Sequence, residues 1–483
     1  MSSLYGDQHV IVSLIRPDPM MKSMAEEYGA SVVAEPDVGR LFEIIEKADL
    51  VHVHFWNTPE LYAVLNLELP LCRLLIWSHV VGDRAPHIIT PALQALADCL
   101  VVSCPNSLLI PAIGNAASKV EHSVELVPAP LDTSRLECDE QLPHDGLRVG
   151  YIGTVDYVKM HPDFVALHAT LDIPDCKIVV VGEGSAESNI RSQVMALGIE
   201  SRFEFLSSTE DIGVLLRGLD VFSYPLAEYS FAASELILQE AMYLGVPPVV
   251  LNHGTPSSMI EHRVSGWIAN NAREFTEGIR YLLDHPEERQ CMGRRAREKI
   301  RKNLSQEPPW QSMQAVYSRL LDRPRRTPSG RSRRAEDQTL QSGALKMISS
   351  FGTEASAFIT SINGPAVENV LEAERIIAES SPILCSPGGG GVLHYRRFYD
   401  QDPYLQLWSG LIFHAQDRPA LAIAEFHGAM KLGLIHWRLN WYMARSAWSA
   451  GSMLLAQRSI GNVLAEAPDF KPALDLAEEL AGV

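Results

Sequence analysis

The sequence lacks the features that mark secreted proteins, membrane-spanning proteins and proteins with a structural metal site. Its seven cysteines are scattered, odd in number and free of any CxxC pair, which disfavours both a disulfide framework and a structural zinc site. No stretch approaches the roughly 18 apolar residues that cross a bilayer, and the first residues have neither the basic nor the long apolar segment of a signal peptide. We therefore expect a soluble protein of a reducing compartment, the cytoplasm.

Positive charge is also scarce. The chain has 41 lysines and arginines against 59 acidic residues, a formal net charge of −18 at pH 7. This balance argues against a general nucleic-acid binder, because such proteins carry a basic surface, and we expect no nucleic-acid partner. At 483 residues with 46% hydrophobic residues, the chain is long enough for about three domains that each bury a core.

Short apolar runs alternate with helical patterns through two consecutive parts of the chain. The first part covers 1–146, and the second covers 147–322, with a closing helix over 306–321. Strands separated by helices indicate parallel sheets with helices on their faces. The predicted fold class is therefore α/β, with two Rossmann-like domains that face each other across a cleft and bind ligands at the carboxyl ends of their strands.

The composition changes sharply after the second domain. The segment Arg323–Arg334 holds six arginines with Pro, Ser and Gly and almost nothing apolar. Such a segment cannot bury a core, so we expect 323–345 to be a flexible linker. A solvated tether is one interpretation, and peripheral contact with an anionic membrane surface is the other.

The last part of the chain, 346–483, is expected to form an all-α module with an internal repeat. Five positions recur 34 residues later. They are Gly410, Asp417, Ala422, Phe426 and Ala429, followed by Ala444, Gly451, Ala456, Ile460 and Val463. This period is typical of tetratricopeptide repeats, although stacked repeats usually need about three units for a stable core. Such a module either binds a protein partner or packs on its own enzyme.

Two motifs of the second domain lie where strands should end. One strand ends at Gly153, where the missing side chain lets backbone amides approach a ligand, and Lys159 stands six residues further on. A lysine in such a turn suits a diphosphate, although surface lysines are common. The run Lys177–Gly184 is a buried strand followed by a loop with Gly182 and Glu183, which fits a nucleotide fold or an ordinary turn.

The strongest motif is Ser234–Leu251. Ser234 is a good N-cap, and the helix after it is apolar nearly all round with Glu240 in its middle. A buried carboxylate is costly unless it is paired, so Glu240 needs either ribose hydroxyls or an internal arginine or lysine. The amino end of the same helix can hold a phosphate through its free N–H groups.

Together these motifs resemble the second domain of the retaining family-four glycosyltransferases, which have the GT-B fold. The resemblance is specific over about 148–322 and weaker over 1–146. The family's strand and turn read Gly-Arg-(four residues)-Lys, which corresponds here to Gly153 and Lys159, with Thr154 in place of the arginine.

The family's later signature is Glu-(seven residues)-Glu followed by Ala-Met-x-x-Gly-x-Pro-Val. Glu240 matches the second glutamate, whereas Ala232 stands where the first should be. Either Glu228 or Glu235 takes that place, and we favour Glu235 because it lies where the family places its donor-phosphate loop. In the first domain, the strand end around His79 resembles the one that bears a histidine near the donor sugar.

The resemblance implies transfer of a sugar from a nucleoside diphosphate sugar to a glycan, lipid-linked or protein acceptor, with retention at the anomeric carbon. It implies His79, Lys159 and Glu235 as catalytic residues. The implied donor-binding residues are Gly153, Thr154, Lys159, Gly182, Glu183, Ser234, Glu235, Leu236 and Glu240. No metal and no other cofactor is expected, because Lys159 and the helix amino end would neutralise the leaving diphosphate.

Three other interpretations remain open at this point. A sugar-nucleotide epimerase can use the same fold. A catalytically weakened scaffold would explain why Thr154, Ala232 and Ser257 depart from the family pattern. An adaptor would act through the repeat-like tail.

Overall fold

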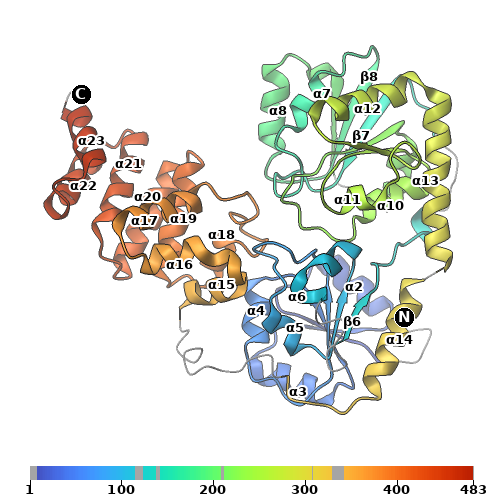
Figure 1. Ribbon diagram of the computed structural model, residues 1–483, viewed down its shortest axis with the longest axis horizontal. Helices are drawn as coiled ribbons and strands as arrows, with labels where there is room; N and C mark the ends of the chain where they lie inside the picture. The colour runs from blue at the N-terminus through green and yellow to red at the C-terminus, as the bar shows by residue number, and fades with distance from the viewer. Residues whose placement is uncertain are drawn as a thin grey trace.

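The computed structural model describes residues 8–114, 123–136, 142–207, 211–306, 308–328 and 342–481. Figure 1 shows two α/β domains, the second above the first, and a helical tail beside the first domain. Within the described residues, no helix combines the length and the apolar character needed to cross a membrane.

The first domain is built on parallel strands. Its sheet has the order β3 (Val51–Phe55), β4 (Leu74–Ser78), β5 (Cys99–Val102) and β6 (Ser123–Leu126). A separate parallel pair consists of β1 (Val10–Ser13) and β2 (Ser31–Ala34). The connecting helices are α2 (Pro19–Glu27), α3 (Val38–Lys47), α4 (Pro59–Leu65), α5 (Pro91–Leu96) and α6 (Pro111–Gly114), with 3-10 turns at Pro105–Leu109 and Ser134–Leu136. Every residue of β4 is buried, as expected for a central strand covered on both faces.

The second domain holds a six-stranded parallel sheet. Its order is β12 (Trp267–Ala269), β11 (Pro248–Leu251), β10 (Val221–Tyr224), β7 (Leu147–Ile152), β8 (Cys176–Val181) and β9 (Phe203–Leu206). The helices are α7 (Phe164–Ala169), α8 (Glu187–Ala196), α9 (Ile212–Arg217), α10 (Leu236–Tyr243), α11 (Gly254–Met259), α12 (Ala272–Asp284) and α13 (Pro286–Gln306), with a 3-10 turn at Glu200–Arg202. Because β7 lies between β8 and β10, the strand order reverses there, and ligands of such sheets bind at the carboxyl ends of the two strands that flank this point.

The closing helix, α14 (Pro309–Leu321), packs on the first domain and not on the second. Its apolar residues Met313, Val316 and Leu320 share a core with Leu75 and Trp77 of β4. The chain therefore crosses back to the first sheet after α13, and the expected boundary at 322 is wrong in assigning this helix to the second domain. The reason is local, because the apolar stripe of α14 covers a sheet face that the first domain leaves open.

The start of the arginine segment is anchored and is not a flexible linker. Arg326 forms an antiparallel bridge with Cys72 and an ion pair with Asp98, whose side chain is 8% exposed. Arg323 accepts a hydrogen bond at its carbonyl from Arg73 at 2.6 Å. The expectation of a linker is therefore wrong for 323–328. Residues 329–341 lie outside the described residues, and α15 already begins at 343.

The regular elements of the tail are all helices in its described residues. It contains α15 (Gly343–Phe351), a 3-10 turn at Gly352–Ala355, α16 (Ser356–Asn363), α17 (Val367–Ala378), α18 (Val392–Phe398), α19 (Pro403–Ala415), α20 (Pro419–Lys431), α21 (Trp437–Ser449), α22 (Met453–Glu466) and α23 (Lys471–Ala481). The hairpins α19–α20 and α21–α22 start 34 residues apart, and a Cβ on Gly410 would lie 2.4 Å from the Phe426 ring. The repeat is thus a pair of stacked hairpins, while its assignment to the tetratricopeptide family remains a prediction.

A buried ion pair ties the tail helices together. Glu374 of α17 has no exposed side-chain surface, and its Oε1 lies 3.2 Å from Nε of Arg438 on α21. Tyr442 donates a hydrogen bond to its other oxygen at 2.6 Å. Burial raises the pKa of Glu374, and the charge of Arg438 opposes this. The tail therefore carries its own internal network and is a packed unit.

The tail docks on the first domain around Asn57, the second residue after β3. This side chain, in a residue only 3% exposed, donates to the carbonyl oxygens of Pro86 at 2.6 Å and of Ser350 at 3.1 Å. Beside it, the Tyr62 hydroxyl donates to Ser349 Oγ at 2.6 Å. The contacts place α15 and α18 against α4, as Figure 1 also shows.

We predict that Gly390→Ala loosens this docking. Gly390 has a φ of +82°, and a Cβ there would lie 2.3 Å from the Asn57 carbonyl oxygen, so backbone must move at a cost of about 1–3 kcal/mol. Hydrogen exchange should speed up in residues 342–363. Gly388→Ala is the matched control, because a Cβ at that position meets nothing within 4 Å. Equal exchange in the two variants would contradict the docking contact.

Candidate functional site

Lys159 lies in the turn that follows β7, at the carboxyl end of the second sheet. Its N–H donates to the Asp156 carbonyl at 2.9 Å, and its own carbonyl accepts from Ala227 N at 2.8 Å. Asp156 also closes the turn through its side chain, which accepts from Val158 N at 2.9 Å. These bonds fix the lysine backbone on both sides, and its side chain keeps 25% of its surface exposed.

Glu235 lies beside Lys159, at the start of α10. Its side chain is fully buried, and Oε2 is 3.5 Å from Lys159 Nζ and accepts a hydrogen bond from the Tyr224 hydroxyl at 2.6 Å. Burial, followed by the charge of Glu235, raises the pKa of Tyr224 far above its usual value, so this hydroxyl stays a donor. The other oxygen, Oε1, is buried and has no hydrogen-bond partner among the described residues.

The backbone of Glu235 is in the left-handed region, with φ 39° and ψ 53°. Residues with a Cβ avoid this region, and non-glycine residues held there cluster at functional sites. Glu235, and not Ser234, is the N-cap residue of α10, so the expected capping by Ser234 is wrong. The Ser234 carbonyl instead accepts from the Gln239 side chain at 2.7 Å.

The amino end of α10 keeps free donors. The Glu235 carbonyl accepts the N–H groups of Leu238 and Gln239, at 3.1 and 3.2 Å. No described residue accepts from the N–H groups of Leu236 and Ile237. N–H groups without a partner at the start of a helix are suited to bind an anion.

The two glycine turns lie against each other. Gly153 N donates to the Val181 carbonyl at 3.0 Å, and a Cβ on Gly182, which has a φ of +130°, would lie 2.1 Å from the Gly153 oxygen. Only glycine fits this approach. Thr154 and Glu183 follow the two strand ends and are exposed.

Glu240 is buried in α10 at 6% exposure, one turn and a half beyond Glu235. The acid in contact with Lys159 is Glu235, which the family resemblance implies as a catalytic residue, whereas the role of Glu240 in donor binding stays a prediction. Tyr224, the donor to Glu235, was missed. Its position at the last residue of β10, beside the strand that precedes Lys159, is the signal that points to it.

The loop that carries Ala232 joins the two domains. Val80 and Ala232 form an antiparallel bridge, and Val81 N donates to the Phe231 carbonyl at 2.9 Å. Arg84 donates to the Glu228 carbonyl at 2.8 Å. Since Val80 follows β4 and this loop follows β10, the carboxyl ends of the two sheets face each other. Glu228 and Glu235 are the two candidates for the role of the family's first glutamate, whose position is occupied here by Ala232. Of these two, Glu235 is the one beside Lys159.

His79, the residue before this bridge, belongs to a row of stacked rings. Its ring lies 5.0 Å from His54 and 4.4 Å from Trp56, at interplanar angles of 10° and 16°. His79 Nε2 is 2.8 Å from His54 Nδ1, and His52 Nδ1 is 2.8 Å from the Tyr317 hydroxyl. No described hydrogen bond or ring contact joins His79 to Lys159 or Glu235.

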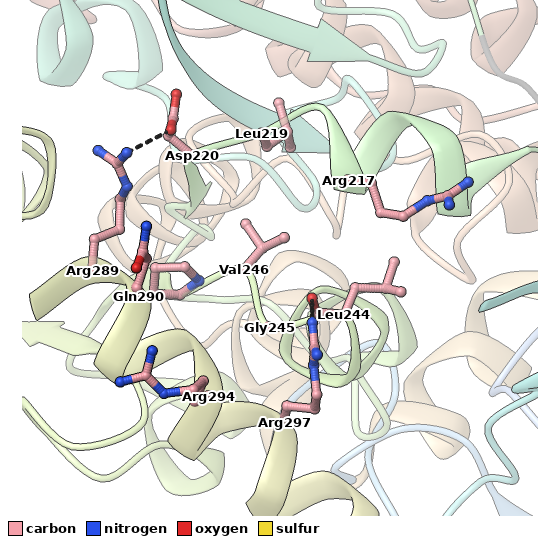
Figure 2. A pocket seen from close by; sticks show the side chains of 11 residues that line it. Arg217, Leu219, Asp220, Leu244, Gly245, Val246, Arg289, Gln290, Arg294 and Arg297 are labelled. Carbon is pink, nitrogen blue, oxygen red and sulfur yellow. Dashed lines mark hydrogen bonds and ion pairs between the residues drawn. The ribbon is translucent and has the colours of Figure 1, made fainter. Parts of the chain in front are cut away.

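A hollow of about 220 Å³ lies at the amino ends of the strands of the second sheet. It is lined by Asp220 and Pro247, which come just before β10 and β11. Figure 2 shows arginines around it that point in different directions. Arg289 pairs with Asp220 at 2.9 Å, and Arg297 donates to the Leu244 carbonyl at 2.5 Å. These arginines attach α13 to the rest of the domain and do not converge on a ligand.

Residues 134–299 match the family model of the glycosyl transferases group 1. The matched stretch contains Lys159, Glu235 and Glu240, and it leaves the four-stranded sheet and the tail outside. This finding supports the resemblance stated from the motifs over the same part of the chain.

Two curated relatives match part of the chain. An uncharacterized glycosyltransferase of Haemophilus influenzae is 28% identical over 117 residues, which are 24% of this chain and 32% of the relative. The D-rhamnosyltransferase WbpZ of Pseudomonas aeruginosa is 30% identical over 161 residues, 31% of this chain and 40% of the relative. The chain thus spans about a third of the length of the first relative and two fifths of the second.

A solved structure extends the likeness to both α/β domains. Anabaena HepE has a TM-score of 0.54 at 16% identity, and the match covers 67% of this chain and 94% of HepE. At this identity the likeness shows the fold. The fold is GT-B, with two Rossmann-like domains and an added helical tail, so the fold class predicted from the sequence is confirmed.

We predict that the stacked histidines make the protein less stable in mild acid. Burial is the largest cause that lowers the pKa of His52 to about 3 and that of His79 to about 4. At pH values between the ordinary histidine pKa of 6.5 and these lowered pKa values, each histidine binds a proton in the unfolded state but not in the folded state. Stability is therefore full above pH 6.5 and falls as the pH drops towards 4, by up to about 1.4 kcal/mol per pH unit for each group.

Urea unfolding between pH 4.5 and 8 measures this slope. His52→Gln removes one of the groups and should flatten the slope below pH 6, whereas His427→Gln, at an exposed position of the tail, should keep the wild-type slope. A wild-type slope in His52→Gln would contradict the assignment.

Proposed function

We propose that this protein is a glycosyltransferase that moves a sugar from a nucleoside diphosphate sugar to an acceptor with retention of the anomeric configuration. The observation that carries the proposal is the buried oxygen Oε1 of Glu235, which has no hydrogen-bond partner among the described residues. Such an atom is costly to leave unpaired. A hydroxyl of the donor sugar would supply the missing partner.

Positive charge for the diphosphate is available beside this oxygen. Lys159 Nζ is partly exposed and is held near Glu235, and the amino end of α10 has N–H groups open at Leu236 and Ile237. The fold itself holds both groups beside Glu235, and such preorganised donors stabilise a leaving group as its charge develops. For this reason the proposal includes no metal ion and no other cofactor.

The remaining site residues complete the proposal. Gly153, Thr154, Gly182 and Glu183 line the strand ends on which the nucleotide would lie, as the switch point of the sheet requires. Ser234 precedes the phosphate-binding helix end, and Glu240 would bind the ribose. His79 would reach the donor sugar from the first domain.

The acceptor of the proposal is a glycan, a lipid-linked sugar or a protein, and a protein partner of the tail belongs to the same proposal. The relatives that match part of the chain include transferases, which favours transfer over the epimerase and adaptor interpretations. HepE was solved with UDP and glucose, so UDP-glucose is the first donor to test in a thermal-shift panel of UDP-, GDP-, ADP- and TDP-sugars.

We predict that Lys159→Ala lowers transfer and donor hydrolysis at least about a hundredfold, the size of effect seen when one preorganised donor is removed. The change also leaves the buried Glu235 carboxylate without its cation, at a cost of about 3–5 kcal/mol in stability. The double variant Lys159→Ala with Glu235→Gln removes that charge and should regain stability without regaining activity.

Initial rates with the donor chosen by the panel, together with thermal melts, separate the two effects. Lys177→Ala is the matched control, because this lysine of the same domain is exposed and donates only to the Ser201 carbonyl. Normal turnover in a folded Lys159→Ala variant would show that the site is assigned wrongly.

A further inference from the structure

Trp56 is a large aromatic side chain left exposed at the place where all three units meet. It follows the last residue of β3, and 43% of its surface is exposed. The next residue is Asn57, whose side chain binds the tail at Ser350. The Asn57 N–H lies 3.3 Å from His87 Nδ1, and the His87 ring lies 4.2 Å from Phe231 of the second domain.

One ring contact holds the indole among the described residues. His79 stacks on it with ring centroids 4.4 Å apart, and His79 is in turn held by His54 at 2.8 Å. No other described ring stacks on Trp56. The indole is thus a flat, partly exposed apolar surface whose orientation is fixed by the stack on His79.

Polar atoms lie at the edge of this surface. The indole Nε1 of Trp56 and the Nδ1 of His79 make no hydrogen bond to any described residue. A ligand that suits the surface therefore has a flat apolar face with hydroxyl groups around its rim. A pyranose ring has this chemistry, because its axial C–H groups form an apolar face and its hydroxyls lie at the edge.

We propose that Trp56 is the platform of an acceptor subsite, on which a pyranose ring of the acceptor stacks. This inference rests on the proposed function. Trp56 belongs to the first domain, whereas the donor groups Lys159 and Glu235 belong to the second. The Val80–Ala232 bridge, next to His79, brings the two sides together. A stacked sugar would therefore lie across the domain junction from the donor.

The tail has a part in this subsite. A Cβ on Gly390 would lie 2.3 Å from the Asn57 carbonyl oxygen, so the tail loop contacts the residue next to the platform. His394 Nε2, in the helix after this loop, lies 3.0 Å from Glu60 Oε1 of α4. The helical tail thus borders the acceptor side of the enzyme.

Binding of methyl pyranosides to the full-length chain tests the proposal without any turnover. Saturation-transfer NMR, with irradiation of aromatic protons, should give signals from the ring C–H groups of methyl gluco-, galacto- or mannopyranoside. Trp56→Ala should lower these signals at least fivefold, and Trp56→Phe should keep most of them. Trp310→Ala, at a tryptophan of α14 that is 38% exposed, should match the wild type.

Kinetics with the same glycosides as acceptors give the second measurement. Trp56→Ala should raise the acceptor KM about five- to tenfold, the range expected for loss of an aromatic contact, and should change the donor KM for hydrolysis by a smaller factor. A donor KM that rises as much as the acceptor KM, or more, would place Trp56 in the donor site and overturn the proposal. So would equal NMR signals in Trp56→Ala and the wild type, or none in the wild type. If no donor is turned over, the proposed function fails, and the NMR comparison still decides whether Trp56 binds sugars.

Discussion

A carboxylate taken out of water needs a cation or hydrogen-bond donors close to it, and in this protein that requirement falls on Glu235. Lys159 and Tyr224 meet it on one oxygen only. The three residues come from segments that follow or end two neighbouring strands, β7 and β10. The strand order of the sheet therefore creates the site, because it brings together the carboxyl ends of strands that are far apart in the sequence.

The carboxyl ends of the strands of this sheet also carry the contact between the two α/β domains. The loop between β10 and α10 bridges to Val80 of the first domain before it reaches Glu235, so contact between the domains and the position of the buried acid depend on one segment. On the other side, Asn57 connects the first domain to the tail. Any movement of one domain against the other would act on the donor groups and the Trp56 surface together.

Local patterns in the sequence predicted the alternation of strands and helices, the 34-residue spacing of the tail hairpins and the position of Lys159, because each depends on neighbouring residues. Contacts between distant segments were not predictable in this way. The partner of α14, the anchoring of Arg326 on Asp98 and the left-handed start of α10 depend on surfaces that only the folded chain creates. Ser234 has the right chemistry for a cap, yet Glu235 takes the cap position because Lys159 and Tyr224 hold its side chain.

In the proposed site, Lys159, Glu235 and the amino end of α10 surround the diphosphate and sugar of one nucleotide sugar. A crystal structure of the full chain soaked with UDP-glucose tests this arrangement most directly. We expect diphosphate oxygens within hydrogen-bond distance of Lys159 Nζ and of the N–H groups of Leu236 and Ile237, with a sugar hydroxyl on Glu235 Oε1. A nucleotide bound elsewhere, such as in the arginine-lined hollow at the amino ends of the strands, would contradict it.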